Sequence, residues 1–255
     1  MTGPSPSPTE PSKVPSGDRI DRKMRLMTTP LDARSLGEQI AEHVARDIID
    51  GRIPEGTRVS EVELAARFGT SRSPVRDAVR ILGLENLLDG SPRRQMTVVT
   101  FDNRSVANLY LVRSRLYGLA ASLHATIGAR SDQDVLIEAS NDMIRASETT
   151  DQELFADANL RFHEVLFATC GNPLLERTLN GLGGLTTAYL QTRVRAVPGR
   201  LRDAGLGHLE AAEAIRDRDA FRAQQAMQGV IVGAGRSLIV HESGDAELAA
   251  LLDIP

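Results

Sequence analysis

Arginine and serine side chains able to read DNA are gathered in one string, Ser71-Arg72-Ser73-Pro74-Val75-Arg76-Asp77-Ala78-Val79-Arg80. A guanidinium group matches the two acceptors on the major-groove edge of guanine, and a hydroxyl can donate to a phosphate oxygen. If the segment is helical with its apolar residues inward, the arginines and serines lie on the outer face near the helix start. A recognition helix in the DNA major groove requires this arrangement.

A second set of polar residues, Asn159, His163 and His208, lies in the C-terminal half of the chain. Asn159 and His163 are four residues apart, so on a helix they project from the same side. His208 belongs to a later predicted helix. The sequence offers no clear nucleophile–base pair, glycine-rich phosphate loop or carboxylate dyad, and an enzyme is therefore a weak hypothesis.

Two short helices joined by a tight turn are predicted over residues 60–88. Ser60 and Glu63 have the spacing of a capping box, so the first helix begins at Glu61. Gly69 ends that helix, because glycine accepts the left-handed conformation of a helix exit. An ordinary helical hairpin with solvated arginines is the alternative for this fragment alone. The residues expected to face inward on the second helix are Val75, Val79, Leu82 and Leu84.

The flanking segments favour DNA binding over the plain hairpin. Ser35 and Glu38 form another capping box, which predicts a helix to about Asp50 with an apolar stripe of Leu36, Ile40, Val44 and Ile48. A polar tip over 89–95, followed by a β-branched run, predicts a wing. A winged helix-turn-helix is therefore predicted for residues 31–101. Its candidate DNA contacts are Arg52, Ser71, Arg72, Ser73, Arg76, Arg80, Arg93 and Arg94.

Residues 102–241 predict an antiparallel six-helix bundle, which makes the chain mainly α. The expected helices cover 103–127, 131–147, 151–169, 174 to about 195, a segment ending at Arg216, and one from a cap at Asp219 through Val240. The residues expected to face inward on the first of them are Val106, Leu109, Tyr110, Val112, Leu116, Leu119 and Leu123.

Composition narrows the possible functions. The 255-residue chain has a net charge of −4 and a pI of about 5.8, so any DNA contact is local. Tryptophan is absent and aromatic content is 4%, which argues against a base-stacking binder of RNA or single strands. With no bilayer-length apolar stretch and no signal-peptide core, the expected location is the cytoplasm, away from membranes. Residues 1–30 are expected to be a disordered tail and 242–255 a loosely held one.

Residues 34–100 resemble the DNA-binding domain of the GntR family of bacterial transcription regulators. The matching strings are Gly51-Arg52-Ile53-Pro54-Glu55-Gly56-Thr57, Ser60-Glu61-Val62-Glu63-Leu64-Ala65 and the arginine-rich string from Ser71, which is the most specific. Asn86 stands where the family usually has glycine at the helix exit, and asparagine tolerates that backbone well. Gly83 replaces a usual glutamate, and Gln95-Met96 replaces a glycine of the wing.

Residues 103–240 resemble the FCD ligand-binding domain of the FadR branch of that family, through Asn159-Leu160-Arg161-Phe162-His163, Gly171-Asn172-Pro173-Leu174-Leu175 and the segment from Gly207 to Asp219. The resemblance implies a divalent metal, zinc or similar, held by Asn159, His163 and His208, and often a carboxylate effector. The family's last histidine falls near Val230, which cannot ligate. A weakly bound metal stays open, but we favour two hydrogen-bonded histidines lining a metal-free cavity.

Arg113 matches an arginine common on the first FCD helix, and Tyr117 stands where a glutamate usually follows. Without that carboxylate, Arg113 is available to an anion in the cavity, and a solvated helix arginine is the alternative. The candidate effector-binding residues are Arg113, Tyr117, Asn159, His163 and His208.

The two resemblances imply a homodimeric transcription regulator, a repressor, that binds a near-palindromic double-stranded operator under the control of a small anionic metabolite, with a carboxylate as the expected class. One alternative is an orphan regulator with neither effector nor metal. Another is a metal-dependent enzyme that uses His163 and His208. A gel shift with the promoter region of the protein's own gene separates the regulators from the enzyme.

Overall fold

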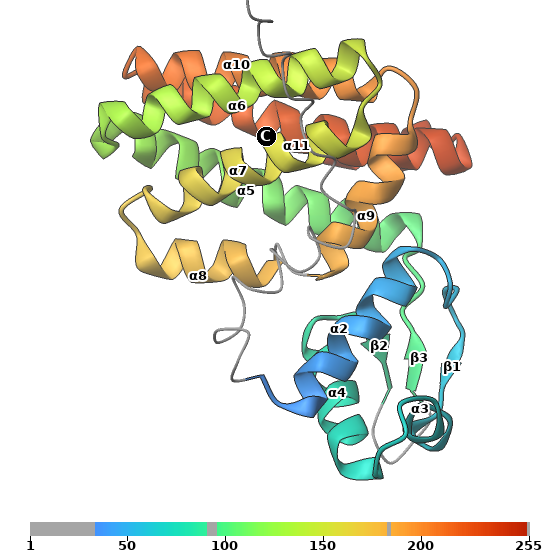
Figure 1. Ribbon diagram of the computed structural model, residues 1–255. Coiled ribbons are helices and arrows are strands. Elements are labelled where there is room, and N and C mark those ends of the chain that lie inside the picture. Colours follow the sequence, from blue (N-terminus) through green and yellow to red (C-terminus); the bar gives the residue numbers. More distant parts are fainter. Residues whose placement is uncertain (1–33, 91–95, 183–184, 254–255) are drawn as a thin grey trace, which may run out of the picture.

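The chain forms a small N-terminal domain and a larger helical domain. Figure 1 shows the helical domain above the N-terminal domain. The computed structural model describes residues 34–90, 96–182 and 185–253. The fold is mainly α, with a winged helix-turn-helix followed by a helical bundle, as the sequence predicts. Arg93 and Arg94 of the predicted wing lie outside the described residues, as do residues 1–33.

The N-terminal domain contains helices α2 (Leu36–Ile49), α3 (Glu61–Arg67) and α4 (Arg72–Leu84). Its antiparallel sheet has the order β1-β3-β2, with β1 at Arg58–Val59, β2 at Leu88–Asp89 and β3 at Met96–Val98. Arg58 pairs with Thr97, and Leu88 pairs with Val98. This register joins the two wing strands to the strand that precedes α3.

Local sequence signals set the ends of these helices. The Ser35 side chain accepts from the Glu38 backbone N–H while the Glu38 carboxylate accepts from Ser35, which completes the predicted capping box. The Ser60 side chain accepts from the Glu63 backbone N–H. Asn86 has a φ of +54°, so it takes the left-handed conformation that the family's glycine usually supplies.

The core of the N-terminal domain follows the predicted stripes with two exceptions. Ile40, Val44 and Ile48 are buried on α2, and Val75, Val79 and Leu82 are buried on α4. Leu84 is 70% exposed, because it lies two residues beyond Leu82 and therefore on the opposite side of the helix. Leu36 is 48% exposed, because its neighbour Gly37 is the residue that meets α4.

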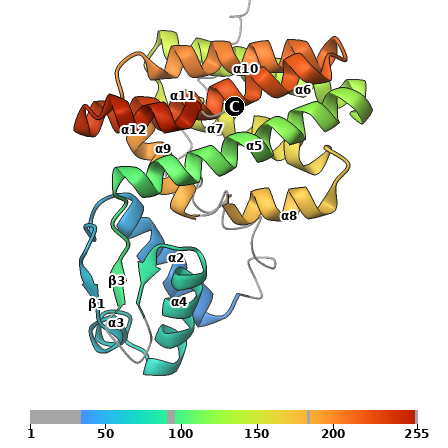
Figure 2. The same cartoon turned by 180° about the vertical axis from the view of Figure 1, so that it is seen from behind.

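The C-terminal domain is built from α5 (Asn103–Ile127), α6 (Arg130–Glu148), α7 (Gln152–Ala168), α8 (Pro173–Leu182), α9 (Leu185–Ala196), α10 (Arg200–Arg216) and α11 (Ala220–Ser243). Helix α5 packs mainly against α11, and α6 packs against both α7 and α10. Figure 2 shows α5 crossing the rear of the bundle beside α11. At this contact a Cβ added to Gly235 would lie 2.7 Å from Tyr110 Cβ, so glycine permits the close approach.

Three predictions for the bundle are wrong. The segment from Leu174 to about Arg195 is not one helix, because α8 and α9 run in different directions on either side of residues 183–184. Val112 and Leu119 do not face inward and are 51% and 42% exposed. The buried face of α5 instead contains many alanines together with Tyr110, Arg113 and Tyr117. The positions of long apolar residues therefore predicted this face poorly.

The described chain after Glu242, which ends at Asp253, is not a loose tail. Helix α11 continues to Ser243, and α12 (Ala246–Ala250) and the 3₁₀ turn η2 (Leu251–Asp253) follow it. Ala249 and Leu252 are buried in the core of the bundle. The segment is held because its apolar residues pack against α5 and α11.

The two domains meet through α9. Tyr189 packs against the hydrophobic cores of both domains, and its hydroxyl donates to the Glu55 carboxylate. Arg193 Nη1 lies 3.2 Å from Glu55 Oε1, and its Nε donates to Glu242 at 2.8 Å. Burial and the neighbouring Glu55 carboxylate raise the pKa of Tyr189 to about 12, so its hydroxyl stays a donor. Within the described residues, every helix is too short or too polar to cross a membrane.

Candidate functional site

The outer face of α4 carries five of the eight candidate DNA contacts. Their side chains are exposed, whereas the apolar stripe of α4 is buried against the domain. Because this burial fixes the rotation of the helix, the polar face points away from the core. The residues brought together there are Ser71, Arg72, Ser73, Arg76 and Arg80.

Glu61, at the start of α3, holds two of these arginines. Its Oε2 lies 3.3 Å from Arg72 Nη2 and 3.6 Å from Arg76 Nη2. The two arginine side chains are 61% and 62% exposed, so these ion pairs contribute little to stability, about 0–1 kcal/mol each. Glu61 therefore orients the guanidinium groups, which stay open to a bidentate acceptor such as a guanine edge or a phosphate.

Arg52, in the turn after α2, belongs to an ion-pair network. Its Nε donates to Asp47 at 2.6 Å, and its Nη1 lies 2.9 Å from Asp50. Arg67 donates to the other Asp47 oxygen at 2.5 Å. Burial acts to raise the pKa of Asp47, but the hydrogen bonds from Arg67 and Arg52 outweigh it and lower the pKa. Arg52 thus ties the end of α2 to the turn after it, and its DNA contact stays a prediction.

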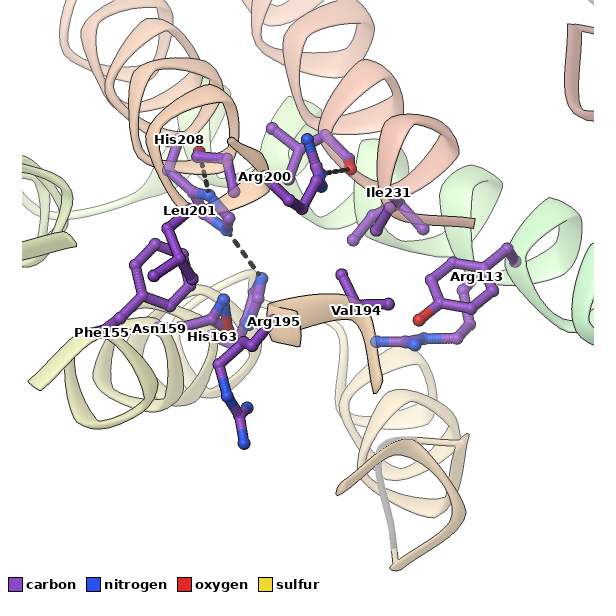
Figure 3. A pocket seen from close by; sticks show the side chains of 14 residues that line it. Arg113, Phe155, Asn159, His163, Val194, Arg195, Arg200, Leu201, His208 and Ile231 are labelled. Carbon is purple, nitrogen blue, oxygen red and sulfur yellow. Dashed lines mark hydrogen bonds between the residues drawn. The ribbon is translucent and has the colours of Figure 1, made fainter. Parts of the chain in front are cut away.

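A cavity in the bundle gathers most of the remaining candidates (Figure 3). The empty space of this cavity together with the solvent at its open mouth is about 490 Å³. None of the side chains that form its described lining is acidic. The lining consists of Tyr110, Arg113, Phe155, Asn159, His163, Val194, Arg195, Arg200, Leu201, Ala204, His208, Val230, Ile231 and Ala234.

Arg113 is a buried cation of this cavity, not a solvated helix arginine. It is 1% exposed, and its Nη2 donates to the Tyr117 hydroxyl at 2.8 Å. Its Nε and Nη1 make no hydrogen bond within the described part of the chain. Tyr117 is not among the residues that line the cavity, so the structure places it behind Arg113 as a support.

Arg200 is a second buried cation, and no motif in the sequence predicts it. It is 7% exposed, its Nη2 donates to the Val230 carbonyl at 2.8 Å, and its Nε finds no partner in the described residues. Burial lowers the pKa of Arg200, although Asp203 acts in the opposite direction. One feature of the sequence marks Arg200 as unusual. Arg200 is the first residue of α10, where the helix dipole disfavours a positive charge.

His163 and His208 both line the cavity, and their imidazole rings contact each other. Their Nε2 atoms lie 3.3 Å apart, and His208 Nδ1 lies 2.7 Å from the Ala204 carbonyl. Burial lowers the pKa of His208 to about 4, so this imidazole is neutral at pH 7. Its Nδ1–H then donates to Ala204, and its Nε2 accepts from His163. The two imidazoles are therefore hydrogen-bonded to each other in the lining of the cavity.

Comparison with known proteins identifies both domains. The family model for bacterial regulatory proteins of the gntR family matches residues 36–98, and the FCD domain matches residues 108–232. An uncharacterized HTH-type transcriptional regulator of Agrobacterium vitis is 33% identical over 132 residues, which cover 50% of this chain and 77% of that protein. The chain belongs to the GntR family. It is a transcription regulator with an N-terminal DNA-binding domain and an FCD ligand-binding domain.

Other members of the GntR family support this assignment. A probable D-xylose utilization operon transcriptional repressor of Paenarthrobacter nicotinovorans is 29% identical, over 77% of this chain and 86% of that protein. The galactonate operon transcriptional repressor of Escherichia coli is 24% identical, over 79% and 96%. The solved structure of E. coli McbR/YncC has the same fold, with a TM-score of 0.60 and 23% identity over 78% of this chain and 94% of that one.

The metal that FCD domains often bind fits this GntR regulator poorly. Two imidazole nitrogens on a tetrahedral zinc are separated by roughly 3.3 Å, so His163 and His208 are suitably spaced. Asn159 adds only a neutral amide, and Val230, which lines the cavity where the family has a histidine, adds nothing. The described residues contain no group of three His, Cys, Asp or Glu able to hold a metal. Zinc usually needs three or four protein ligands, so this set does not meet the requirement of a tightly held ion.

Proposed function

We propose that this GntR regulator represses transcription by placing α4 of two protomers on a near-palindromic operator, and that a small carboxylate in the FCD cavity controls operator affinity. The observation that carries the effector half is the pair of buried guanidinium groups of Arg113 and Arg200 in a cavity whose described lining contains no carboxylate. An uncompensated buried charge is costly, so an anion that enters this cavity is bound favourably.

For the DNA half, the proposed base contacts are Arg72 and Arg76, with Arg80 on a flanking phosphate and the hydroxyls of Ser71 and Ser73 on others. Their exposure on the outer face of α4 supports this assignment. One α4 contacts only a few base pairs. In a two-fold symmetric dimer the two α4 helices contact both halves of an inverted repeat, which doubles the number of contacts.

The proposed effector class is a hydroxylated carboxylate of the sugar-acid type. The galactonate operon repressor is among the relatives, and galactonate carries one carboxylate and several hydroxyls. The cavity offers matching groups, because Arg113 can bind a carboxylate while Asn159 and His163 can hydrogen-bond hydroxyls.

Helix α9 is the proposed route from the cavity to the DNA-binding domain. Val194 and Arg195 line the cavity, and Tyr189 and Arg193 of the same helix contact Glu55 in the other domain. A ligand that favours one position of α9 therefore favours one placement of the DNA-binding domain. A ligand can shift operator affinity only through such a difference.

We expect sugar acids to raise the thermal unfolding temperature of the protein, and Arg113→Met to remove most of that shift. A ligand at a hundred times its Kd stabilises the folded state by about 2.7 kcal/mol. Thermal shift across a panel of carboxylic acids measures this, with the exposed Arg130 as a control in Arg130→Met. A ligand that binds Arg113→Met and His163→Ala as tightly as the native protein binds outside this cavity and contradicts the proposal.

We expect a homodimer at micromolar concentration and a short inverted repeat as its DNA site. Two-fold symmetry in the protein requires two-fold symmetry in the bases it contacts. Sedimentation velocity gives the oligomeric state, and footprinting on the protein's own promoter gives the site. A strict monomer that binds a single half-site with full affinity would exclude this arrangement.

A further inference from the structure

The guanidinium group of Arg200 lies beside the position of the missing metal ligand. Its Nη2 donates to the carbonyl of Val230, the residue that stands in place of the family's last histidine. Its Nη1 lies over Gly233 one turn later, where an added Cβ would be 3.4 Å away. The chain has thus lost a metal ligand on α11 and placed a permanent cation against the same stretch of that helix.

Two positive charges therefore face this cavity without a carboxylate partner. Arg113 and Arg200 are both at least nine-tenths buried, and neither forms an ion pair within the described ranges. Asp203 acts on Arg200 through space but does not line the cavity. In Figure 3 the Arg195 guanidinium points away from the other labelled side chains.

We propose that the cavity is specific for a small organic dianion, with one acidic group on Arg113 and the other on Arg200, and that it binds this ligand without a metal. Arg113 comes from α5 and Arg200 from α10, and their guanidinium groups lie apart in Figure 3. Two separated carboxylates on one short chain match this arrangement better than one carboxylate does. The inference rests on the proposed effector function and narrows its ligand to dicarboxylates.

The groups near the two cations suit hydroxyls on such a ligand. Tyr110 lines the cavity beside Arg113, whose guanidinium carbon lies 5.2 Å from the centre of the Tyr110 ring. Burial raises the pKa of the Tyr110 hydroxyl while the charges of Arg113 and Arg200 act to lower it, so it lies within the field of both cations. A hydroxylated dicarboxylate would bring its own acceptors to the free N–H groups of the arginines and to this hydroxyl.

The test compares matched acids on the full-length protein. Calorimetry measures the Kd of gluconate and galactonate and of their dicarboxylate counterparts, glucarate and galactarate, with and without EDTA. We expect each dicarboxylate to bind about tenfold tighter or more than its monocarboxylate, since a second charge-assisted contact is added. We expect EDTA to leave every Kd unchanged.

Variants then assign the second acidic group to Arg200. Arg200→Met should remove the preference by weakening only the dicarboxylates, whereas Arg113→Met should weaken both classes. Arg200→Lys keeps the charge and should keep part of the preference. Without ligand, Arg200→Met should raise the unfolding temperature, because it removes a buried charge that no carboxylate contacts. This readout also shows that the variant folds.

The outcomes of these experiments distinguish a failure of the two-cation site from a failure of the proposed effector function. If monocarboxylates bind as tightly as dicarboxylates, or if Arg200→Met weakens both classes equally, the two-cation site is wrong while the effector function stands. If EDTA abolishes binding, the metal-free assignment is wrong. If no acid in either class binds, the effector function itself fails.

Discussion

Arg76→Ala should weaken binding to the specific operator by about ten- to a hundredfold. A bidentate contact between arginine and guanine contributes roughly 1–3 kcal/mol of discrimination, and each 1.4 kcal/mol is about tenfold in Kd. Arg76 is 62% exposed on the outer face of α4, and Glu61 at 3.6 Å is a weak competitor for it. Fluorescence anisotropy with the operator and with a scrambled duplex measures the effect, which should be larger on the operator.

A matched control separates the effect of losing an arginine on α4 from the effect of losing one positive charge anywhere in the protein. Arg216→Ala deletes one exposed arginine at the end of α10 and should leave the operator Kd unchanged. Figure 1 shows α10 on the side of the helical domain opposite to the DNA-binding domain. Arg72→Ala should also weaken operator binding, because Arg72 shares Glu61 with Arg76. Unchanged operator affinity in both the Arg72 and Arg76 variants would refute the assignment of α4 as the recognition helix.

The DNA-binding domain could be predicted from sequence because local signals fix it. Capping residues at Ser35 and Ser60, the exit at Asn86 and an apolar stripe on each helix all act within a few residues of the chain. Leu84 shows the limit of this approach, since an apolar residue beside the stripe was counted as part of it. The packing of the bundle was harder to predict. Helix α5 packs on α11 through small residues and a close glycine contact, which a hydrophobicity pattern does not predict.

The cavity could be predicted only in part for a related reason. Asn159, His163 and His208 belong to sequence motifs, and Arg113 matches a family position on the first helix, so the sequence indicates all four of these lining residues. Arg200 follows a turn and looks like a solvated arginine in the sequence. Its burial results from tertiary packing of α10 against α11, which no local pattern reports. Tyr117 was named because it stands where the family usually has a glutamate, and in the structure it accepts a hydrogen bond from Arg113 and is not among the lining residues.

Glu55→Ala should uncouple the effector from the operator while leaving both binding sites intact. The Glu55 carboxylate accepts from Tyr189 and pairs with Arg193 at 3.2 Å, so one substitution removes these two polar contacts between α9 and the DNA-binding domain. Glu55 lies outside the cavity and off the outer face of α4. Effectors typically change affinity at a second site by about 5- to 150-fold. We expect the ratio of operator Kd with and without effector to fall toward one in this variant.

Effector binding, followed by thermal shift, should survive in Glu55→Ala, because Glu55 does not line the cavity and its partners Tyr189 and Arg193 do not line it either. Glu210→Ala removes an equal charge from an exposed position on α10 and should keep the full response. Tyr189 packs against both domain cores through its ring, so Tyr189→Phe keeps this packing and tests the hydroxyl alone. If Glu55→Ala retains the native response, the polar contacts of α9 do not carry the signal, and the coupling runs through another contact between the domains.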